Sequence, residues 1–171
     1  GLNRVYFHTF TCSPAEQGIP GQEYFAGTHV NPRVTWWSKS APFIDYMHRV
    51  QMLAQEGTFV ADVLYYYGDH VPNVYPFKHS DMPGAMFGFD YDVTDENILM
   101  KSDVENGDIV VPGGRKYKVL VLPDHRILSL PVLEKLETLV KEGASVLGPK
   151  PQKAVSLAGG EKGVAEFKQL A

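Results

Sequence analysis

Cysteine is almost absent from the sequence, since Cys12 is the only one among 171 residues. One thiol cannot form an intrachain disulfide, and it excludes zinc sites built from several thiolates. Cys12 follows an expected strand without the Gly-x-Cys-x-Gly turn that would expose a nucleophile, and no basic neighbour can be placed beside it. We interpret Cys12 as structural or incidental, with a catalytic thiol as the alternative.

Long runs of basic or apolar residues are also missing. Lys and Arg never occur more than two in a row and the net charge is -4, so no nucleic-acid partner is expected. No apolar run approaches the ~20 residues that span a bilayer, so no membrane partner is expected either. With 44% hydrophobic and 21% charged residues, the composition is typical of a globular domain.

The common nucleotide and metal motifs do not occur. G-x-G-x-x-G and the P-loop pattern are absent, and Gly113-Gly114 precedes an expected strand, which favours a simple turn. His8 and His29 lack the close spacing of paired metal ligands. The acidic stretch 90–97 lacks the spacing and glycine of a calcium loop, and it is interpreted as a helix start capped by Asp92 or Thr94. Because these motifs are missing, the sequence predicts no cofactor and no metal site in this chain.

A catalytic acid and base cannot be placed in the chain. Glu16 and Glu23 lie in a long loop, where glutamates are usually solvated, whereas a glycosidase needs two carboxyls facing one bond. Asp62 lies inside the apolar stretch VADVLYY, where a structural hydrogen-bonding role is expected. No residue is therefore assigned as catalytic.

The first residues are rich in strand-forming side chains. Leu2, Val5 and Phe7 are interspersed with polar residues, which predicts a half-buried strand over residues 2–8. A strand so early in the chain needs neighbours to satisfy its backbone groups. We therefore expect the chain to be a piece of a longer one.

Helical periodicity is clearest in two segments. Residues 42–56 have Pro42 in the first turn and an apolar face, with Gly57 as the expected left-handed stop. Residues 130–142 carry leucines at helical spacing between a Ser129 cap and a Gly143 stop. Both segments are predicted to be amphipathic helices.

Strands and helices alternate from Phe59 onward. Short apolar strands are expected over residues 59–67, 117–122 and 144–148, and further short helices near residues 94–102 and 161–171. This order predicts an α/β fold with a parallel sheet, Rossmann-like or flavodoxin-like, covered by helices on both faces.

Aromatic, amide and imidazole side chains gather in the first forty residues. Flat aromatic rings cover the C–H faces of sugars, while amides and imidazoles bind their hydroxyls. The alternative is that the Trp pair fills a core and that the histidines are structural. The candidate substrate-binding residues are Asn3, His8, His29, Asn31, Trp36 and Trp37.

Several blocks of sequence together resemble the α-L-rhamnosidases of glycoside hydrolase family 106. The blocks are GLNRVYFHTFTCSP, GTHVNPRVTWW, FIDYMHRVQMLAQEGTFVADVLYYYGDHVPN, GDIVVPGGRKYKVLVLPD and VLEKLETLVKEGASVLGPKP. Their order and spacing carry the resemblance across nearly the whole chain.

The resemblance implies two parts. Residues 1–57 would be the last strand, loop and helix of a (β/α)8 catalytic barrel, and residues 58–171 part of a class I glutamine amidotransferase-like domain. No cysteine occurs in the second part, so glutamine hydrolysis is not expected. The family's catalytic glutamates would lie upstream of Gly1, and calcium is expected only in the parent enzyme.

The resulting hypothesis is a fragment of a glycoside hydrolase that acts on terminal α-L-rhamnosides and is inactive alone. Its partners would be the rhamnoside substrate and the rest of the parent chain, with a homo-oligomer left open. A periplasmic or secreted location follows from the resemblance. The alternative is a non-catalytic α/β interaction or oligomerisation module.

Overall fold

The computed structural model describes residues 2–8, 18–19, 21, 30–72, 88–155 and 160–171. The chain divides into two compact units, Gly1–Thr58 and Phe59–Ala171. Each unit is described by itself.

The first unit is built on one long helix, α1 (Ala41–Gln55), preceded by the 3-10 turn η2 (Trp37–Lys39). Pro42 lies in the first turn of α1, which confirms the predicted helix start. The helix ends through a bond from the Glu56 N–H to the Leu53 carbonyl at 3.4 Å. Gly57 does not take the left-handed conformation, so the expected glycine stop is wrong: the last turn simply tightens.

The strand expected over residues 2–8 is not observed in the described part of the chain. The segment instead lies along α1, because the Val5 N–H donates to Gln51 Oε1 at 2.7 Å and Gln55 Nε2 donates to the Asn3 carbonyl at 2.6 Å. A strand needs the backbone of a second strand to pair with, and the described residues of this unit contain none.

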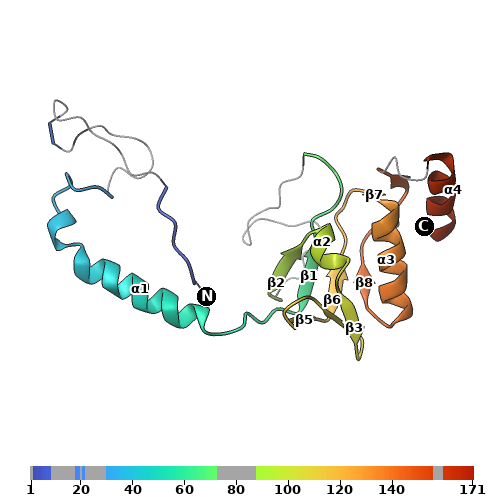
Figure 1. Ribbon diagram of the computed structural model, residues 1–171, viewed down its shortest axis with the longest axis horizontal. Helices are drawn as coiled ribbons and strands as arrows, with labels where there is room; N and C mark the ends of the chain where they lie inside the picture. The colour runs from blue at the N-terminus through green and yellow to red at the C-terminus, as the bar shows by residue number, and fades with distance from the viewer. Residues whose placement is uncertain (1, 9–17, 20, 22–29, 73–87, 156–159) are drawn as a thin grey trace. The chain divides into compact units, whose positions relative to one another are not determined.

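The second unit contains a four-stranded parallel sheet (Figure 1). Its strands are β1 (Val63–Tyr66), β2 (Tyr91–Thr94), β6 (Val119–Val121) and β8 (Val146–Leu147), in the order β2-β1-β6-β8. β1 is fully buried and pairs with β2 on one side and β6 on the other. The predicted parallel α/β sheet is confirmed. The order also means that the chain reverses its direction across the sheet after β2.

An antiparallel insertion separates β2 from β6. It follows α2 (Glu96–Leu99) and consists of β3 (Asp103–Glu105), β4 (Asp108–Val110) and β5 (Lys116–Tyr117). Asn106 and Gly107 both have positive φ, 54° and 85°, as the two-residue turn between β3 and β4 requires. Gly113 and Gly114, with φ of 94° and 81°, form the turn between β4 and β5 that the sequence predicts.

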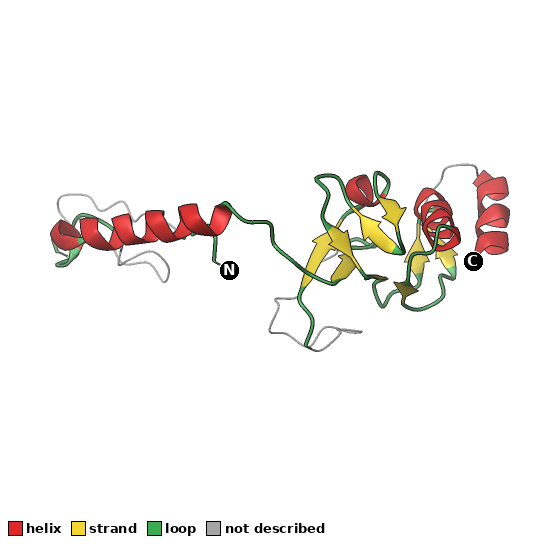
Figure 2. Ribbon diagram, turned by 90° about the horizontal axis from the view of Figure 1, so that it is seen from below, coloured by secondary structure: helices red, strands yellow, loops and turns green. Residues whose placement is uncertain are grey.

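The C-terminal part adds two helices that lie side by side in both views, α3 (Leu130–Lys141) and α4 (Gly160–Leu170) (Figures 1 and 2). A short parallel pair, β7 (Ile127–Leu128) and β9 (Lys153–Ala154), accompanies them. Ser129 caps α3 by accepting from the Val132 N–H at 3.4 Å, and Gly143 follows the helix with φ of 104°. Both predicted helix signals are confirmed.

The two faces of the sheet are buried by different means. Leu64 and Tyr66 point into the main core, to which α2, α3 and α4 all contribute, for example through Phe167. Val63 and Tyr65 point to the opposite face, where the described cluster contains only residues of the sheet. The expected helix cover is confirmed for the first face, and no described helix packs on the second. The connections β2–β6 and β6–β8 cross the sheet in the same direction, so their right-handed crossovers place α2 and α3 on the same face. The β1–β2 connection runs in the opposite direction and therefore belongs to the other face.

Candidate functional site

The Trp pair of the first unit lies at the N-terminal end of α1. Trp36 and Trp37 immediately precede the helix, with ring centroids 6.2 Å apart and ring planes at 60°. Trp36 is 37% exposed. Tilted, partly exposed rings can cover the apolar face of a sugar, so these residues keep the geometry that a binding role needs.

The segment that carries Asn3 and His8 is fastened to the C-terminal half of α1. The segment 2–8 runs antiparallel to the helix, since Asn3 lies beside Gln55 and Val5 beside Gln51. The bond to Gln55 holds Asn3 beside the C-terminal end of α1, and His8 is exposed. Asn3 therefore lies at the opposite end of α1 from Trp36 and Trp37.

Of the remaining two candidates, Asn31 is the one that the structure describes. Asn31 is only 3% exposed, and its Oδ1 accepts from the Arg33 N–H at 2.8 Å. That bond gives the Asn31 side chain a role in shaping the turn before η2. His29 lies outside the described residues, as do Cys12, Glu16 and Glu23.

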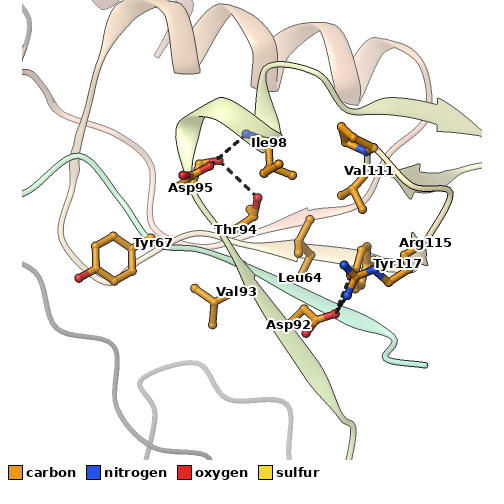
Figure 3. A pocket seen from close by; sticks show the side chains of 11 residues that line it. Leu64, Tyr67, Asp92, Val93, Thr94, Asp95, Ile98, Val111, Arg115 and Tyr117 are labelled. Atoms are coloured by element: carbon orange, nitrogen blue, oxygen red, sulfur yellow. Dashed lines mark hydrogen bonds and ion pairs between the residues drawn. The ribbon is translucent and has the colours of Figure 1, made fainter. Parts of the chain in front are cut away.

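The second unit contains a pocket of about 370 Å³ beside β2 and the β4–β5 turn (Figure 3). Leu64, Val111 and Ile98 supply apolar walls, and the polar groups gather at Asp92. Asp92 Oδ2 accepts from the Tyr117 hydroxyl at 2.7 Å and from Arg115 Nη1 at 3.3 Å.

The Asp92 network ties strands together rather than supplying a reactive group. Burial, reinforced by the hydrogen bond to Asp92, raises the pKa of Tyr117 to about 12. Tyr117 therefore keeps its proton near neutral pH and acts as a donor to Asp92. Because Tyr117 and Arg115 both bond to Asp92, these three side chains hold one wall of the pocket in place.

A second pocket, of about 590 Å³, adjoins the first, with which it shares Tyr67 and Asp95. It is lined by residues 66–71, residues 95–97, Ser129 and Val155. The lining therefore consists of the segments that follow β1 and β2, together with the cap of α3. We call it the carboxyl-edge pocket.

One wall of the carboxyl-edge pocket is held by Asp69. Its carboxylate accepts from the Tyr66 hydroxyl and, at 2.6 Å, from the Ser129 N–H. Burial and the bond to Asp69 raise the pKa of Tyr66 well above its ordinary value, so the phenol remains protonated. Asp69 thus fastens the loop after β1 to the start of α3.

The sequence interpretation missed the polar residues at this edge of the sheet. Two Asp-His dipeptides, 69–70 and 124–125, follow the adjacent parallel strands β1 and β6 within a few residues. The carboxyl ends of parallel strands meet at one edge, so the repeated dipeptide was a usable signal. The His70 and His125 ring centroids lie 5.3 Å apart.

The acidic residues singled out in the sequence have other roles than expected. Asp95, rather than Asp92 or Thr94, caps α2 by accepting from the Ile98 N–H at 3.0 Å, because Asp92 and Thr94 belong to β2. Asp62 is exposed, and its backbone carbonyl, not its side chain, accepts from the Lys118 N–H at 2.7 Å. In the described part of the chain, no three acidic, His or Cys side chains group as metal ligands, and no helix is long and apolar enough to cross a membrane.

Known proteins resemble the chain along its whole length. A putative β-glucuronidase from Formosa agariphila is 38% identical over 170 residues, which cover 99% of this chain but 14% of that protein. The structure of a rhamnosidase from Novosphingobium sp. PP1Y superposes with a TM-score of 0.67 and 28% identity, over 87% of this chain and 14% of that one. The chain therefore spans about a seventh of these relatives. The alpha-L-rhamnosidase family model, glycoside hydrolase family 106, matches residues 1–171, and the chain belongs to this family.

Proposed function

We propose that the chain is part of a glycoside hydrolase that removes terminal α-L-rhamnosyl groups, and that it supplies one wall of the sugar site. The family match over residues 1–171 carries this proposal. The neighbouring rings of Trp36 and Trp37 support it, because aromatic rings cover the apolar faces of sugars.

The proposal assigns the two parts of the chain to different domains of the longer protein. Residues 1–57 would form the closing part of a (β/α)8 barrel, and residues 58–171 an amidotransferase-like domain. Supporting the first part, an extended segment, a loop and an antiparallel helix follow one another, as in a β/α unit of a barrel. Supporting the second, the parallel strands have the order 2-1-3-4 along the sheet, as in doubly wound flavodoxin-like folds.

The carboxylates that carry out hydrolysis would come from elsewhere in the longer protein. In an acid/base mechanism one carboxylic acid protonates the leaving oxygen and one carboxylate activates water. This chain would orient the sugar ring, with Trp36 and Trp37 covering its apolar face and His8 and His29 binding hydroxyls. Calcium binding, and export of the protein, are further expectations of the family and belong to the longer protein.

The test is an activity assay on two proteins, the 171-residue chain and the whole gene product that contains it. We expect the gene product to hydrolyse p-nitrophenyl α-L-rhamnoside and the chain alone to be inactive. Trp36→Ala in the gene product should raise KM roughly tenfold, the loss of one stacked ring at about 1.4 kcal/mol. Phe89→Ala, which removes an exposed aromatic of the second unit, is the matched control and should leave KM unchanged.

Two results would overturn this assignment. If the gene product hydrolysed p-nitrophenyl β-D-glucuronide and not the rhamnoside, its activity would be the one named for the Formosa agariphila relative. Equal KM values for the Trp36→Ala variant and the unmodified gene product would remove the first unit from the sugar site.

A further inference from the structure

The carboxyl-edge pocket lies where parallel α/β sheets bind ligands. Such sheets place ligands outside the carboxyl ends of their strands, beside the point where the strand order reverses. Here that point is between β1 and β6, because the chain goes from β1 outward to β2 and then returns to β6. Residues 66–71 follow β1 and line the pocket, and Ser129 enters from the connection that follows β6.

The pocket walls are held in place before any ligand binds. Asp69 joins the loop after β1 to the Ser129 N–H. Gly68, with φ of 92°, packs so closely that an added Cβ would lie 2.6 Å from His125 Nε2 and 2.9 Å from Pro123 Cγ. A preformed wall loses little conformational entropy on binding, which favours a specific small-molecule site.

His125 carries an unsatisfied hydrogen-bonding capacity behind this wall. Its Nδ1 and Nε2 are both buried and have no hydrogen-bond partner in the described part of the chain. A neutral imidazole has one N–H and one acceptor nitrogen, and leaving such buried groups unpaired is unfavourable. The exposed His70, whose ring neighbours His125, lines the pocket. His70 is therefore the imidazole of this pair that a bound ligand can reach.

The charges of the lining restrict the ligand class. Asp69, Asp95 and Glu96 line the pocket, and none of its described lining residues is Lys or Arg, so phosphates and carboxylates would be repelled. Asp69 and Asp95 already accept hydrogen bonds from backbone N–H groups, so their negative charge is partly compensated without a bound cation. Asn97, His70 and Ser129 add neutral donors and acceptors, and the Tyr67 ring adds an apolar surface.

We propose that the carboxyl-edge pocket binds a neutral, hydroxyl-rich ligand, a saccharide unit, separately from the catalytic site of the longer protein. A hydroxyl can donate to the carboxylates and can either donate to or accept from the Asn97 amide and the His70 imidazole, and it carries no charge. The volume of about 590 Å³ is that of an ordinary small-molecule pocket. The site is contained within the second unit and does not depend on the proposed hydrolysis.

The test is a titration of the isotopically labelled 171-residue chain, followed by amide chemical shifts. The probes are L-rhamnose, D-galactose and N-acetyl-D-glucosamine as neutral sugars, inorganic phosphate as an anion and spermidine as a cation. We expect at least one neutral sugar to shift the amides of residues 67–71 and 95–97. Asn97→Ala and His70→Ala should each weaken that binding about 5- to 10-fold, the loss of one hydrogen bond.

Matched controls separate this site from the rest of the chain. Gln169→Ala and His48→Ala remove an exposed amide on α4 and an exposed imidazole on α1, and should leave the affinity unchanged. Far-UV circular dichroism checks that the pocket variants remain folded, as expected for two exposed side chains. Shifts produced by phosphate or spermidine alone, or by none of the five probes, would overturn the proposal. Because Trp36→Ala tests only the first unit, failure here leaves the proposed hydrolase function standing.

Discussion

At the scale of single residues, Gly68 is a position with little freedom to change. Its φ of 92° disfavours any side chain, and the space that a Cβ would need is occupied by His125 and Pro123. Gly113 has nearly the same φ, 94°, but nothing lies within 4 Å of its added Cβ. Alanine at either position would strain the backbone, but only alanine at Gly68 would also clash with neighbouring side chains.

We predict that Gly68→Ala destabilises the chain more than Gly113→Ala. Strain at positive φ costs about 1–3 kcal/mol in both variants, and overpacking adds roughly another 1–3 kcal/mol only at Gly68. Urea unfolding followed by circular dichroism measures both free energies of unfolding. Equal losses would show that the loops after β1 and β6 do not pack as closely as described.

At the scale of elements, the side-chain bonds between strands and helices hold the second unit in register. Tyr117 on β5 donates to Asp92 on β2, and Asp69 joins the end of β1 to the start of α3. These bonds involve buried or half-buried groups, so they are worth more than the exposed ion pairs such as Lys116–Glu105.

Tyr117→Phe is predicted to lower the free energy of unfolding by about 1–2 kcal/mol at pH 7, because it removes a hydrogen bond to a carboxylate. Tyr6→Phe alters a phenol that is 80% exposed and should change stability by less than about 0.5 kcal/mol. Chemical denaturation of both variants makes the comparison. A loss at Tyr117 no larger than that at Tyr6 would contradict the role of the Asp92 network.

The same residue predicts a pH dependence. The pKa of Tyr117 is about 12 in the folded chain, above the value of about 10 for an unfolded tyrosine. The protonated phenol therefore contributes its full stabilisation below pH ~10, and the contribution is lost as pH rises toward 12. Denaturation curves between pH 9 and 12 should fall less steeply for Tyr117→Phe than for the unmodified chain. Parallel curves would refute the shift.

At the scale of the whole molecule, the two units differ in how much they bury. The second unit has a main core that joins its sheet to three helices. α1 has no fully buried residue, and large apolar side chains on it are exposed, Leu53 by 69% and Met52 by 59%. A helix of 15 residues without a packed face is marginal in water.

We predict that amide hydrogens of α1 exchange much faster than those of α3 in the 171-residue chain. In the whole gene product, if α1 is a barrel helix, its amides should become as protected as those of α3, because neighbouring strands would bury its apolar face. Hydrogen exchange followed by mass spectrometry measures both helices in one experiment. Fast exchange of α1 in both proteins would contradict a barrel position.

The predictability of the candidate sites also depends on scale. The grouping of Trp36 with Trp37 was readable because the two are adjacent in sequence. The separation of Asn3 from them was not, because it depends on the antiparallel course of residues 2–8 along α1. The carboxyl-edge pocket was missed, since it is assembled from residues 66–71, 95–97, Ser129 and Val155, which no local pattern connects.

The sequence by itself determined the class of the fold and the positions of the main helices. Ser129, Gly143 and the leucines between them act within one or two turns, so their effect is local and readable. Tertiary structure alone decided the strand order, the face on which the helices pack and the meeting of the two Asp-His dipeptides. These features depend on contacts between residues far apart in sequence, such as Asp69 with Ser129, whose free energy exists only once the sheet has formed.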